Sequence, residues 1–139
     1  MSKAPARWEF VRRAVQIRNE LHSDTLIIGN GDVLGIDDAN EKVRETGCDG
    51  VMFGRAIFGN PWLFNKTVRR DDVPLPERFR ALVEHTKLFE GLLGGKNFAI
   101  MKKHFKAYVS GFDGAKELRM ELMETKNAAE VTAIVSRFL

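Results

Sequence analysis

Two glycine-containing turns carry the residues of this sequence that could bind an anion. Residues 29–32 (GNGD) follow an apolar run at 26–28, and Gly54 and Arg55 follow another at 50–53. Glycine lets backbone N–H groups approach an anion closely, a following helix N-terminus adds partial positive charge, and arginine can bind a phosphate through two N–H groups. The spacing therefore permits a phosphate site, although many turns of this kind are plain strand-to-helix connections.

The segments around these turns are typical of a strand–helix–strand unit. Both apolar runs are short and bounded by glycine, which indicates buried parallel strands. The helix between them is predicted over residues 36–45, with Asp37 and Asp38 as structural carboxylates in its first turn and Gly47 as a left-handed cap. Because the carboxyl ends of parallel strands share one edge of a sheet, the two turns should lie where α/β proteins bind ligands.

The remainder of the sequence is predicted to be mostly helical. A helix is expected over residues 6–21, and Pro61 suits the first position of a short helix over 61–68. The charged segment 69–76, which contains two prolines, is the best candidate for a domain boundary. Beyond it, apolar stripes predict a small antiparallel bundle of helices at 77–93, 97–110, 114–124 and 127–138.

Composition indicates an ordered globular protein. Of the 139 residues, 44% are hydrophobic and 29% are charged, which argues against disorder. The sequence has no apolar run of membrane-spanning length and no secretory signal pattern, so no membrane partner is expected. Its single cysteine, Cys48, excludes an intramolecular disulfide and a cysteine-based zinc site, so a cytoplasmic location is expected. Cys48 itself is expected to be a small buried thiol.

The net charge of +3 lies entirely in the second half of the sequence. Residues 1–76 carry 11 Lys/Arg and 11 Asp/Glu, whereas residues 77–139 carry 11 and 8. Such an excess is compatible with a polyanion partner but is too small to establish one.

Three lysines form the candidate surface for such a partner. Lys102, Lys103 and Lys106 fall on roughly one face of a predicted helix, and Arg119 could extend the patch. Each could contact a phosphate in a salt-sensitive manner without reading sequence. A solvated helix face is the alternative interpretation.

The histidines give no metal site. His22 and His85 are each expected to be isolated, without a second ligand at metal-binding spacing. His104 is placed by helical geometry on the flank opposite the lysines, where packing within the bundle and RNA contact both remain open. Phe105 and Tyr108 are expected to belong to the core.

The two turns, together with the motifs around them, resemble the tRNA-dihydrouridine synthase family. The run IIGNGDV…A…TGCDGVMFGRAIFGNPWLF is similar to that family's NGD turn, DGVM-GR strand and GNPW-like helix start. Residues 6–8 (ARW) resemble the segment before its sixth barrel helix, and residues 101–104 (MKKH) with Tyr108 resemble an RKH…Y motif of its C-terminal helical domain. The resemblance covers nearly the whole chain. Other flavin barrels share a GA/CD-x-VM-x-G strand but not this combination.

The resemblance implies an oxidoreductase that acts on tRNA with a flavin. Enzymes of this family use NADPH or NADH to reduce FMN, which exchanges a hydride with the C5–C6 bond of uridine. Carried onto matching positions, the residues that would bind the FMN phosphate, mostly through backbone N–H groups, are Asn30, Gly31, Asp32, Gly54 and Arg55.

The resemblance also implies a docking surface for tRNA. The helical domain of the family helps to hold the tRNA, which makes Lys102, Lys103, Lys106 and Arg119 the expected RNA-binding residues. No catalytic residue is assigned, because the family's catalytic cysteine would lie in barrel strands before residue 1, and Cys48 is no substitute. This chain alone is therefore expected to be inactive.

The fold class that follows is α/β and then all-α. Residues 1–73 are expected to form the C-terminal part of a flavin-binding (β/α)8 TIM barrel, and residues 77–139 a helical tRNA-binding domain. The unpaired strands of a partial barrel could drive self-association.

Two other functions stay open on the residues themselves. The first is a stand-alone RNA-binding or assembly module without flavin chemistry. The second is a fragment of another phosphate-binding barrel enzyme, in which the helical tail serves only packing. A flavin spectrum would separate the family function from the first alternative, and RNA binding by residues 77–139 alone would argue against the second.

Overall fold

The computed structural model describes residues 4–139 and divides the chain into two compact units. The first unit is Met1–Ile57 and the second is Phe58–Leu139. Residues 58–73, which are predicted to belong to the barrel, lie in the helical unit by this division. None of the helices in the described part of the chain has the length and apolar character that crossing a membrane requires.

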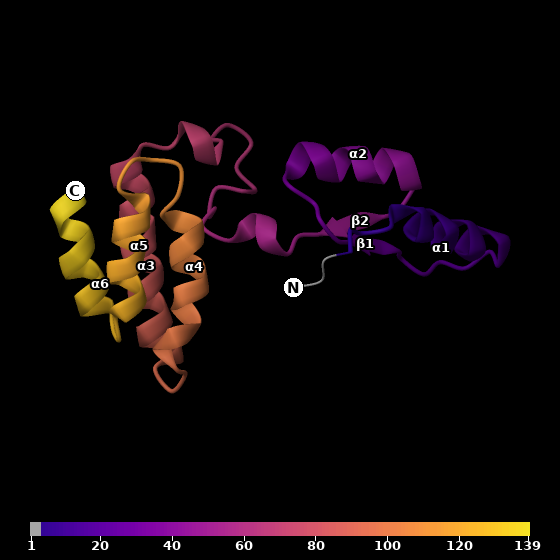
Figure 1. Ribbon diagram of the computed structural model, residues 1–139. Coiled ribbons are helices and arrows are strands. Elements are labelled where there is room, and N and C mark those ends of the chain that lie inside the picture. Colours follow the sequence, from indigo (N-terminus) through magenta and orange to yellow (C-terminus); the bar gives the residue numbers. More distant parts are fainter. Residues whose placement is uncertain (1–3) are drawn as a thin grey trace. The chain divides into compact units, whose positions relative to one another are not determined.

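The first unit is a strand–helix–strand unit preceded by a helix (Figure 1). Its elements are α1 (Trp8–Glu20), β1 (Ile28–Asn30), α2 (Ile36–Thr46) and β2 (Gly50–Met52). The two strands pair in parallel, with Gly29 opposite Val51. The predicted parallel strands with a helix between them are therefore confirmed, but β1 lies two residues later than the predicted run at 26–28 and includes Gly29 and Asn30, which are predicted to belong to the turn.

The ends of α2 form as the sequence predicts. Asp37 and Asp38 lie in its first turn, and Asp38 Oδ2 accepts a hydrogen bond from the Leu34 N–H at 2.9 Å. At the other end, Gly47 has a φ of 74°, the left-handed conformation that glycine adopts without the cost that a Cβ would add. These two ends position the turn after β1 and the start of β2.

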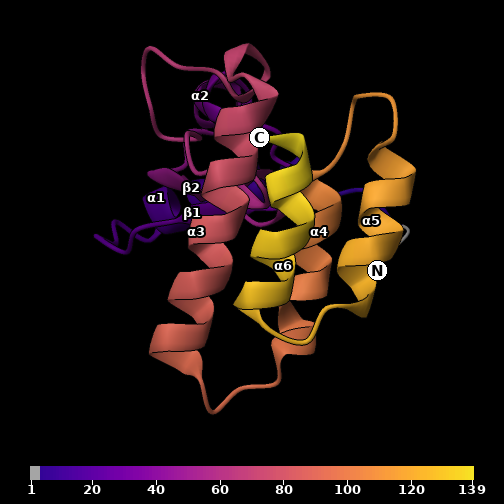
Figure 2. The same cartoon turned by 90° about the vertical axis from the view of Figure 1, so that its left-hand side faces the viewer.

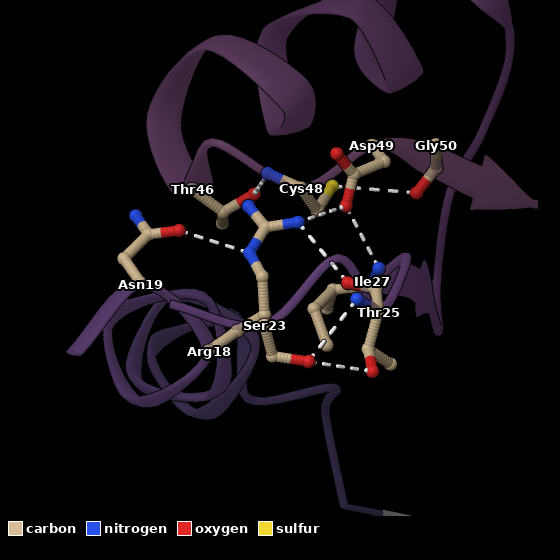
Figure 3. Close-up of polar contacts among 9 residues, drawn as sticks. All are labelled: Arg18, Asn19, Ser23, Thr25, Ile27, Thr46, Cys48, Asp49 and Gly50. Carbon is tan, nitrogen blue, oxygen red and sulfur yellow. Dashed lines mark hydrogen bonds and ion pairs between the residues drawn. The ribbon is translucent and has the colours of Figure 1, made fainter. Parts of the chain in front are cut away.

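A polar network joins α1 to the amino edge of the sheet (Figure 3). Arg18 Nη1 donates to Asp49 Oδ2 at 2.8 Å and to the Thr25 carbonyl at 3.2 Å. The Ile27 N–H donates to the same carboxylate oxygen of Asp49 at 2.8 Å. Cys48, buried next to this network, donates its thiol to the Gly50 carbonyl at 3.3 Å, as expected for a structural thiol. The network fixes the starts of both strands, at the edge opposite the two turns.

Replacing Asp49 by asparagine should destabilise the first unit in a manner that depends on pH. The Ile27 N–H, and after it the Arg18 guanidinium, hold the pKa of the Asp49 carboxyl below its ordinary value. A carboxyl with a lower pKa in the folded state stabilises the fold above its unfolded pKa, and that contribution is lost as the pH falls through the folded pKa. The loss of stability in Asp49→Asn should therefore be present at neutral pH and shrink below about pH 4.

Urea unfolding of the wild-type chain and Asp49→Asn, followed by circular dichroism from about pH 7 to about pH 3, measures this difference. A gap between the two midpoints that stays constant across the series would contradict a role for the ionised carboxylate.

The second unit is a helical bundle (Figure 2). Its α-helices are α3 (Leu75–Leu93), α4 (Lys102–Tyr108), α5 (Ala115–Glu124) and α6 (Ala128–Val135). Helix α3 packs against α4 and α6, and α5 packs against the same two helices. The buried core that they share consists of Phe79, Leu82, Phe89, Met101, Phe105, Tyr108, Val109, Ala115, Leu118, Leu122, Val131 and Val135. Phe105 and Tyr108 are thus core residues, as predicted.

Two helix predictions in this unit need correction. The helix predicted over 61–68 is wrong, because these residues form turns. Asn65 Oδ1 accepts hydrogen bonds from the backbone N–H groups of Thr67 and Val68, at 2.8 and 3.1 Å, in place of a helical ladder. The segment predicted as one helix over 97–110 is instead a 3₁₀ turn, Phe98–Met101, followed by α4. Asn97 begins this turn by accepting from the Ala99 N–H at 2.9 Å.

Three arginines bind the carbonyl groups at the end of α4, and we call them the arginine collar: Arg70, Arg78 and Arg119. Arg70 donates to the Ala107 carbonyl at 2.7 Å, Arg78 donates to those of Tyr108 and Ser110 at 2.9 Å each, and Arg119 donates to that of Val109 at 2.9 Å. The last carbonyls of a helix carry partial negative charge and have no helical partner, so cations are stabilising there. The collar fixes the end of α4.

Candidate functional site

The two turns line a common depression of about 510 Å³ in the first unit. We call it the two-turn depression, and it is lined by Asn30, Gly31, Asp32, Val33, Leu34, Gly54, Arg55 and Ala56. All five residues predicted to bind a phosphate belong to this set. The structure therefore brings them together, while the ligand that they bind stays a prediction.

Backbone conformation shapes the first of these turns. Gly31 has a φ of 128° and Asp32 a φ of 52°, both in the region that side chains rarely adopt. Asp32 Oδ2 accepts a hydrogen bond from the Ala6 N–H at 2.8 Å. Asp32 thus keeps its unusual conformation because its carboxylate is held by the segment that precedes α1.

Arg55 forms an ion pair with Asp32 across the two-turn depression. Both side chains are substantially exposed, so the pair itself adds little to stability. The guanidinium has five N–H donors, and those that Asp32 does not use are available to an anion. Asp32 therefore serves this site by orienting Arg55, and its own negative charge would oppose a phosphate rather than bind it.

The N-terminus of α2 contributes less to an anion site than the sequence suggested. Asp37 and Asp38 already place two carboxylates in its first turn, and Asp38 uses the Leu34 N–H. By contrast, a Cβ added at Gly54 would meet nothing within 4 Å in the described part of the chain, so its backbone is open to a ligand. Chemically, the depression can hold an anion through the open backbone of the turns and Arg55.

The lysines of α4 form a surface that is entirely basic in charge. Lys103 and Lys106 are exposed and Lys102 is half-buried, and the helix sequence KKHFKAY contains no acidic residue. Lys102 and Lys106 lie one turn apart on the same face. Lys103 points elsewhere, because its Nζ lies 5.4 Å from the centroid of the Phe58 ring. The predicted patch is thus two lysines on one face, with the third beside Phe58.

Arg119 occupies a different kind of position from these lysines. It is half-buried in α5, and its guanidinium donates to the Val109 carbonyl as part of the arginine collar. Sequence reasoning missed the other two members of the collar. Arg78 carried the detectable signal, because it stands three residues after Leu75 and four before Leu82, on the apolar stripe of α3, where it is 8% exposed. A charged residue in such a stripe requires a buried partner.

His85 is not isolated, which corrects the sequence expectation. The ring centroids of His85 and His104 lie 4.8 Å apart in an edge-to-face arrangement, and His85 Nδ1 is 3.3 Å from the Tyr108 hydroxyl. His104 also packs edge-to-face against Phe58, at 4.9 Å between centroids. The packing of α3 against α4 brings these rings together. No local pattern in the sequence could have predicted this contact. Among the described residues, no group of three or more potential ligands could hold a metal ion.

His104 should titrate well below an ordinary histidine. Burial lowers the pKa of its imidazole to about 4, with smaller contributions from the charges of His85 and Lys103. The unfolded chain then takes up a proton near pH 6.5, where the folded chain does not, so the stability of the second unit should fall as the pH drops from about 6.5 to about 4. Replacement by glutamine should flatten this part of the stability curve.

An NMR titration of the imidazole resonances measures the pKa of His104 directly. A midpoint for His104 at the ordinary histidine value of about 6.5 would contradict the effect of burial on its ring.

The structure defines a parallel α/β unit whose two turns line a depression at the carboxyl edge of its sheet. In the sequence this unit is followed by a helical bundle that contains a basic helix. A family model described as dihydrouridine synthase (Dus) matches residues 1–138, and the chain belongs to this family. Enzymes of the family are TIM barrels, and the described structure is mostly helical with a small sheet. The resemblance found in the sequence is therefore confirmed, and a fragment of an unrelated barrel family is excluded.

Curated relatives agree with the family model. The chain is 36% identical over 140 aligned positions to a probable tRNA-dihydrouridine synthase of Staphylococcus aureus (strain MRSA252), and equally similar to one of Staphylococcus epidermidis. It is 34% identical to a probable tRNA-dihydrouridine synthase 2 of Bacillus subtilis (strain 168). Each alignment covers 99% of this chain and 42% of the relative, so the chain spans less than half the length of these proteins.

Proposed function

We propose that this chain supplies the FMN-phosphate site and a tRNA-docking surface of a flavin-dependent tRNA-dihydrouridine synthase. The observation that carries the proposal is the two-turn depression, in which the five residues carried over from the family lie together. FMN bound there would supply hydride chemistry toward a uridine of tRNA, with NADPH or NADH as the reductant. The chain's own residues would hold the phosphate and thereby position the flavin ring.

The contacts that support phosphate binding come from backbone and charge. Gly54 leaves its backbone open, Arg55 offers guanidinium N–H groups, and Asp32 orients Arg55. An arginine that binds a phosphate makes charge-assisted hydrogen bonds, which are about twice as strong as neutral ones. Arg55 is thus the side chain on which phosphate affinity should depend most.

The comparison of FMN with riboflavin tests this proposal, because the two differ only by the phosphate. Titrations of the 139-residue chain, followed by calorimetry or NMR, should show FMN binding at least about tenfold more tightly than riboflavin, since one charge-assisted hydrogen bond contributes about 1.5–3 kcal/mol. Arg55→Gln should remove most of that preference. The matched control is Arg44→Gln, an exposed arginine of α2 that does not line the depression.

Equal affinities for FMN and riboflavin would contradict the phosphate site. If Arg44→Gln lost the preference for FMN as fully as Arg55→Gln, the preference would depend on net charge and not on a contact with Arg55.

The docking surface for tRNA is proposed on α4. Its support is the exposure of Lys103 and Lys106, the absence of acidic residues from the helix sequence, and the +3 charge of the second half of the sequence. A phosphate backbone meets such a surface through contacts that release counterions and do not depend on sequence. Because its guanidinium is bound to the Val109 carbonyl, Arg119 would contribute positive electrostatic potential to this surface and would not contact RNA with a free side chain.

The exposed face of the small sheet is proposed to be covered in the full protein. Ile28 and Met52 point to the same face and are each 54% exposed, with Leu26 exposed nearby in the sequence. A TIM barrel packs such side chains into its interior. We therefore propose that residues 1–73 belong to the barrel of the full enzyme and residues 77–139 to its helical domain, and that this apolar face could otherwise pair two copies of the chain.

A further inference from the structure

Two hydrogen bonds join the first turn to the start of α1, one from its first residue and one from the segment before it. The Trp8 indole Nε1–H donates to the Gly31 carbonyl at 3.0 Å, and the Ala6 N–H donates to Asp32 Oδ2 at 2.8 Å. These contacts join residues 23 and 26 positions apart in the sequence, and neither is a backbone hydrogen bond of a helix or of the sheet. They hold the Gly31 carbonyl and the Asp32 side chain, which are neighbours in the turn.

The packing between these segments is close as well as polar. A Cβ added at Gly29 would lie 2.3 Å from a ring carbon of Trp8, and one added at Gly31 would lie 2.5 Å from the Cβ of Ala6. No real Cβ tolerates such distances, so the indole fits over β1 only because residue 29 is glycine. The turn and the segment at 6–8 are therefore built to fit each other.

These contacts connect Trp8 to the chemistry of the two-turn depression. Gly31 and Asp32 line the depression, and Asp32 forms the ion pair with Arg55. Holding the Gly31 carbonyl fixes the peptide planes of the turn, and with them the directions of its N–H groups. A turn that is already ordered loses less conformational entropy when an anion binds, so affinity is higher than for a mobile turn.

We propose that Trp8 is a positioning residue: its indole N–H holds the Gly31 carbonyl, and thereby keeps the first turn in its binding conformation before any ligand arrives. Trp8 does not touch the ligand itself. The nature of that ligand, the phosphate of FMN, rests on the proposed function given above, whereas the ordering of the turn does not.

Amide hydrogen exchange of the ligand-free chain tests the ordering. Trp8→Phe keeps an aromatic side chain but removes the indole N–H donor together with part of the ring that packs over Gly29, so a control for lost packing volume is needed. The amides of residues 30–34 should then exchange roughly fivefold faster, the change expected for one lost hydrogen bond. The control is Val15→Ala, which removes buried volume from α1 at a side chain that packs beside Gly47 rather than at the turn. Unchanged exchange in Trp8→Phe, or equal acceleration in Val15→Ala, would overturn the proposal.

A second measurement uses only the wild-type chain, so it remains informative even if Trp8→Phe does not fold. The sequence has two tryptophans, Trp8 and Trp62, so its NMR spectrum holds two indole N–H resonances. The Trp8 indole N–H should exchange several-fold more slowly than a free indole, because it is hydrogen-bonded. Exchange at the rate of a free indole would overturn the proposal.

A titration with FMN separates this proposal from the proposed function. The Trp8 indole resonance should shift as FMN binds, and the dissociation constant of Trp8→Phe should rise roughly fivefold, with Val15→Ala unchanged. If the wild-type chain binds no FMN, the proposed function fails while the exchange comparison still decides the role of Trp8. If FMN binds the wild type and Trp8→Phe equally well, Trp8 is structural only and the positioning role is overturned.

Discussion

Gly59→Ala is expected to lower the free energy of unfolding of the helical unit by about 2–5 kcal/mol. A Cβ at this position would lie 2.5 Å from the Ala107 carbonyl carbon and 2.7 Å from the Tyr108 backbone nitrogen. Backbone atoms cannot move aside as a flexible side chain can, so the end of α4 would have to shift. Gly59 also has a φ of 64°, which adds a cost of about 1–2 kcal/mol for any residue with a Cβ.

The shift would reach the arginine collar. Arg70 Nε donates to the Gly59 carbonyl at 3.2 Å, and another of its nitrogens donates to the Ala107 carbonyl at 2.7 Å, so one guanidinium joins the two backbones that the new Cβ would separate. Arg78 sits next along the same helix end and is buried, and burial lowers the pKa of its guanidinium. Loss of its carbonyl partners would leave a buried charge without compensation.

Gly111→Ala is the matched control. Gly111 has a φ of 82°, but a Cβ there would meet nothing within 4 Å in the described part of the chain. Gly111→Ala should therefore lower the free energy of unfolding only by the cost of the left-handed backbone conformation, about 1–2 kcal/mol. Urea unfolding monitored by circular dichroism measures both variants. Equal losses would show that the close approach of Gly59 to α4 is unimportant.

Reversal of the three α4 lysines is expected to weaken tRNA binding on the order of 100-fold at moderate salt. The variant combines Lys102→Glu, Lys103→Glu and Lys106→Glu. Each lysine that contacts a phosphate contributes about 0.7–0.9 to the slope of log affinity against log salt, so the slope should also become shallower by about two to three. Titrations of tRNA into the 139-residue chain across a salt series measure both quantities.

A charge-matched control is available in the same unit. Lys87, Lys96 and Lys126 are exposed and lie outside α4, and their reversal to glutamate changes the net charge by the same amount. This control should retain most of the affinity and a slope close to that of the wild type. An equal loss in both triple variants would mean that RNA responds to net charge and not to α4. Absence of binding by the wild type would contradict the docking surface in this chain.

Much of the first unit could be predicted because its signals are local. Short apolar runs bounded by glycine predicted both strands, with β2 at its predicted place and β1 two residues later than predicted. Gly47 ended α2 as expected, and the shared edge of parallel strands put residues 30–32 beside Gly54 and Arg55. Each of these inferences depends on neighbours in the sequence or on the geometry of a parallel pair. The family motifs added the expected ligand, which no local pattern contains.

The features that escaped prediction are contacts between a side chain and a distant backbone. Arg78 reaches carbonyl groups 30 and 32 positions away, and the Trp8 indole reaches one 23 positions away. The pair of His85 and His104 likewise depends on how α3 packs against α4. Such contacts produce no repeating pattern in the sequence, so they can be recognised only once the three-dimensional arrangement of the elements is known. The helix prediction for residues 61–68 was wrong for a local reason, because the Asn65 side chain competes with helix formation by accepting from backbone N–H groups.

Amide chemical-shift mapping with FMN tests the central claim most directly, because it locates the ligand even when binding is weak. The two-turn depression predicts that the amides of residues 30–34 and 54–56 shift as FMN is added, and that inorganic phosphate shifts a subset of the same amides. Riboflavin should leave that subset unmoved. Shifts centred on other residues, or none at concentrations that saturate a weak site, would contradict the assignment of this depression as the flavin-phosphate site.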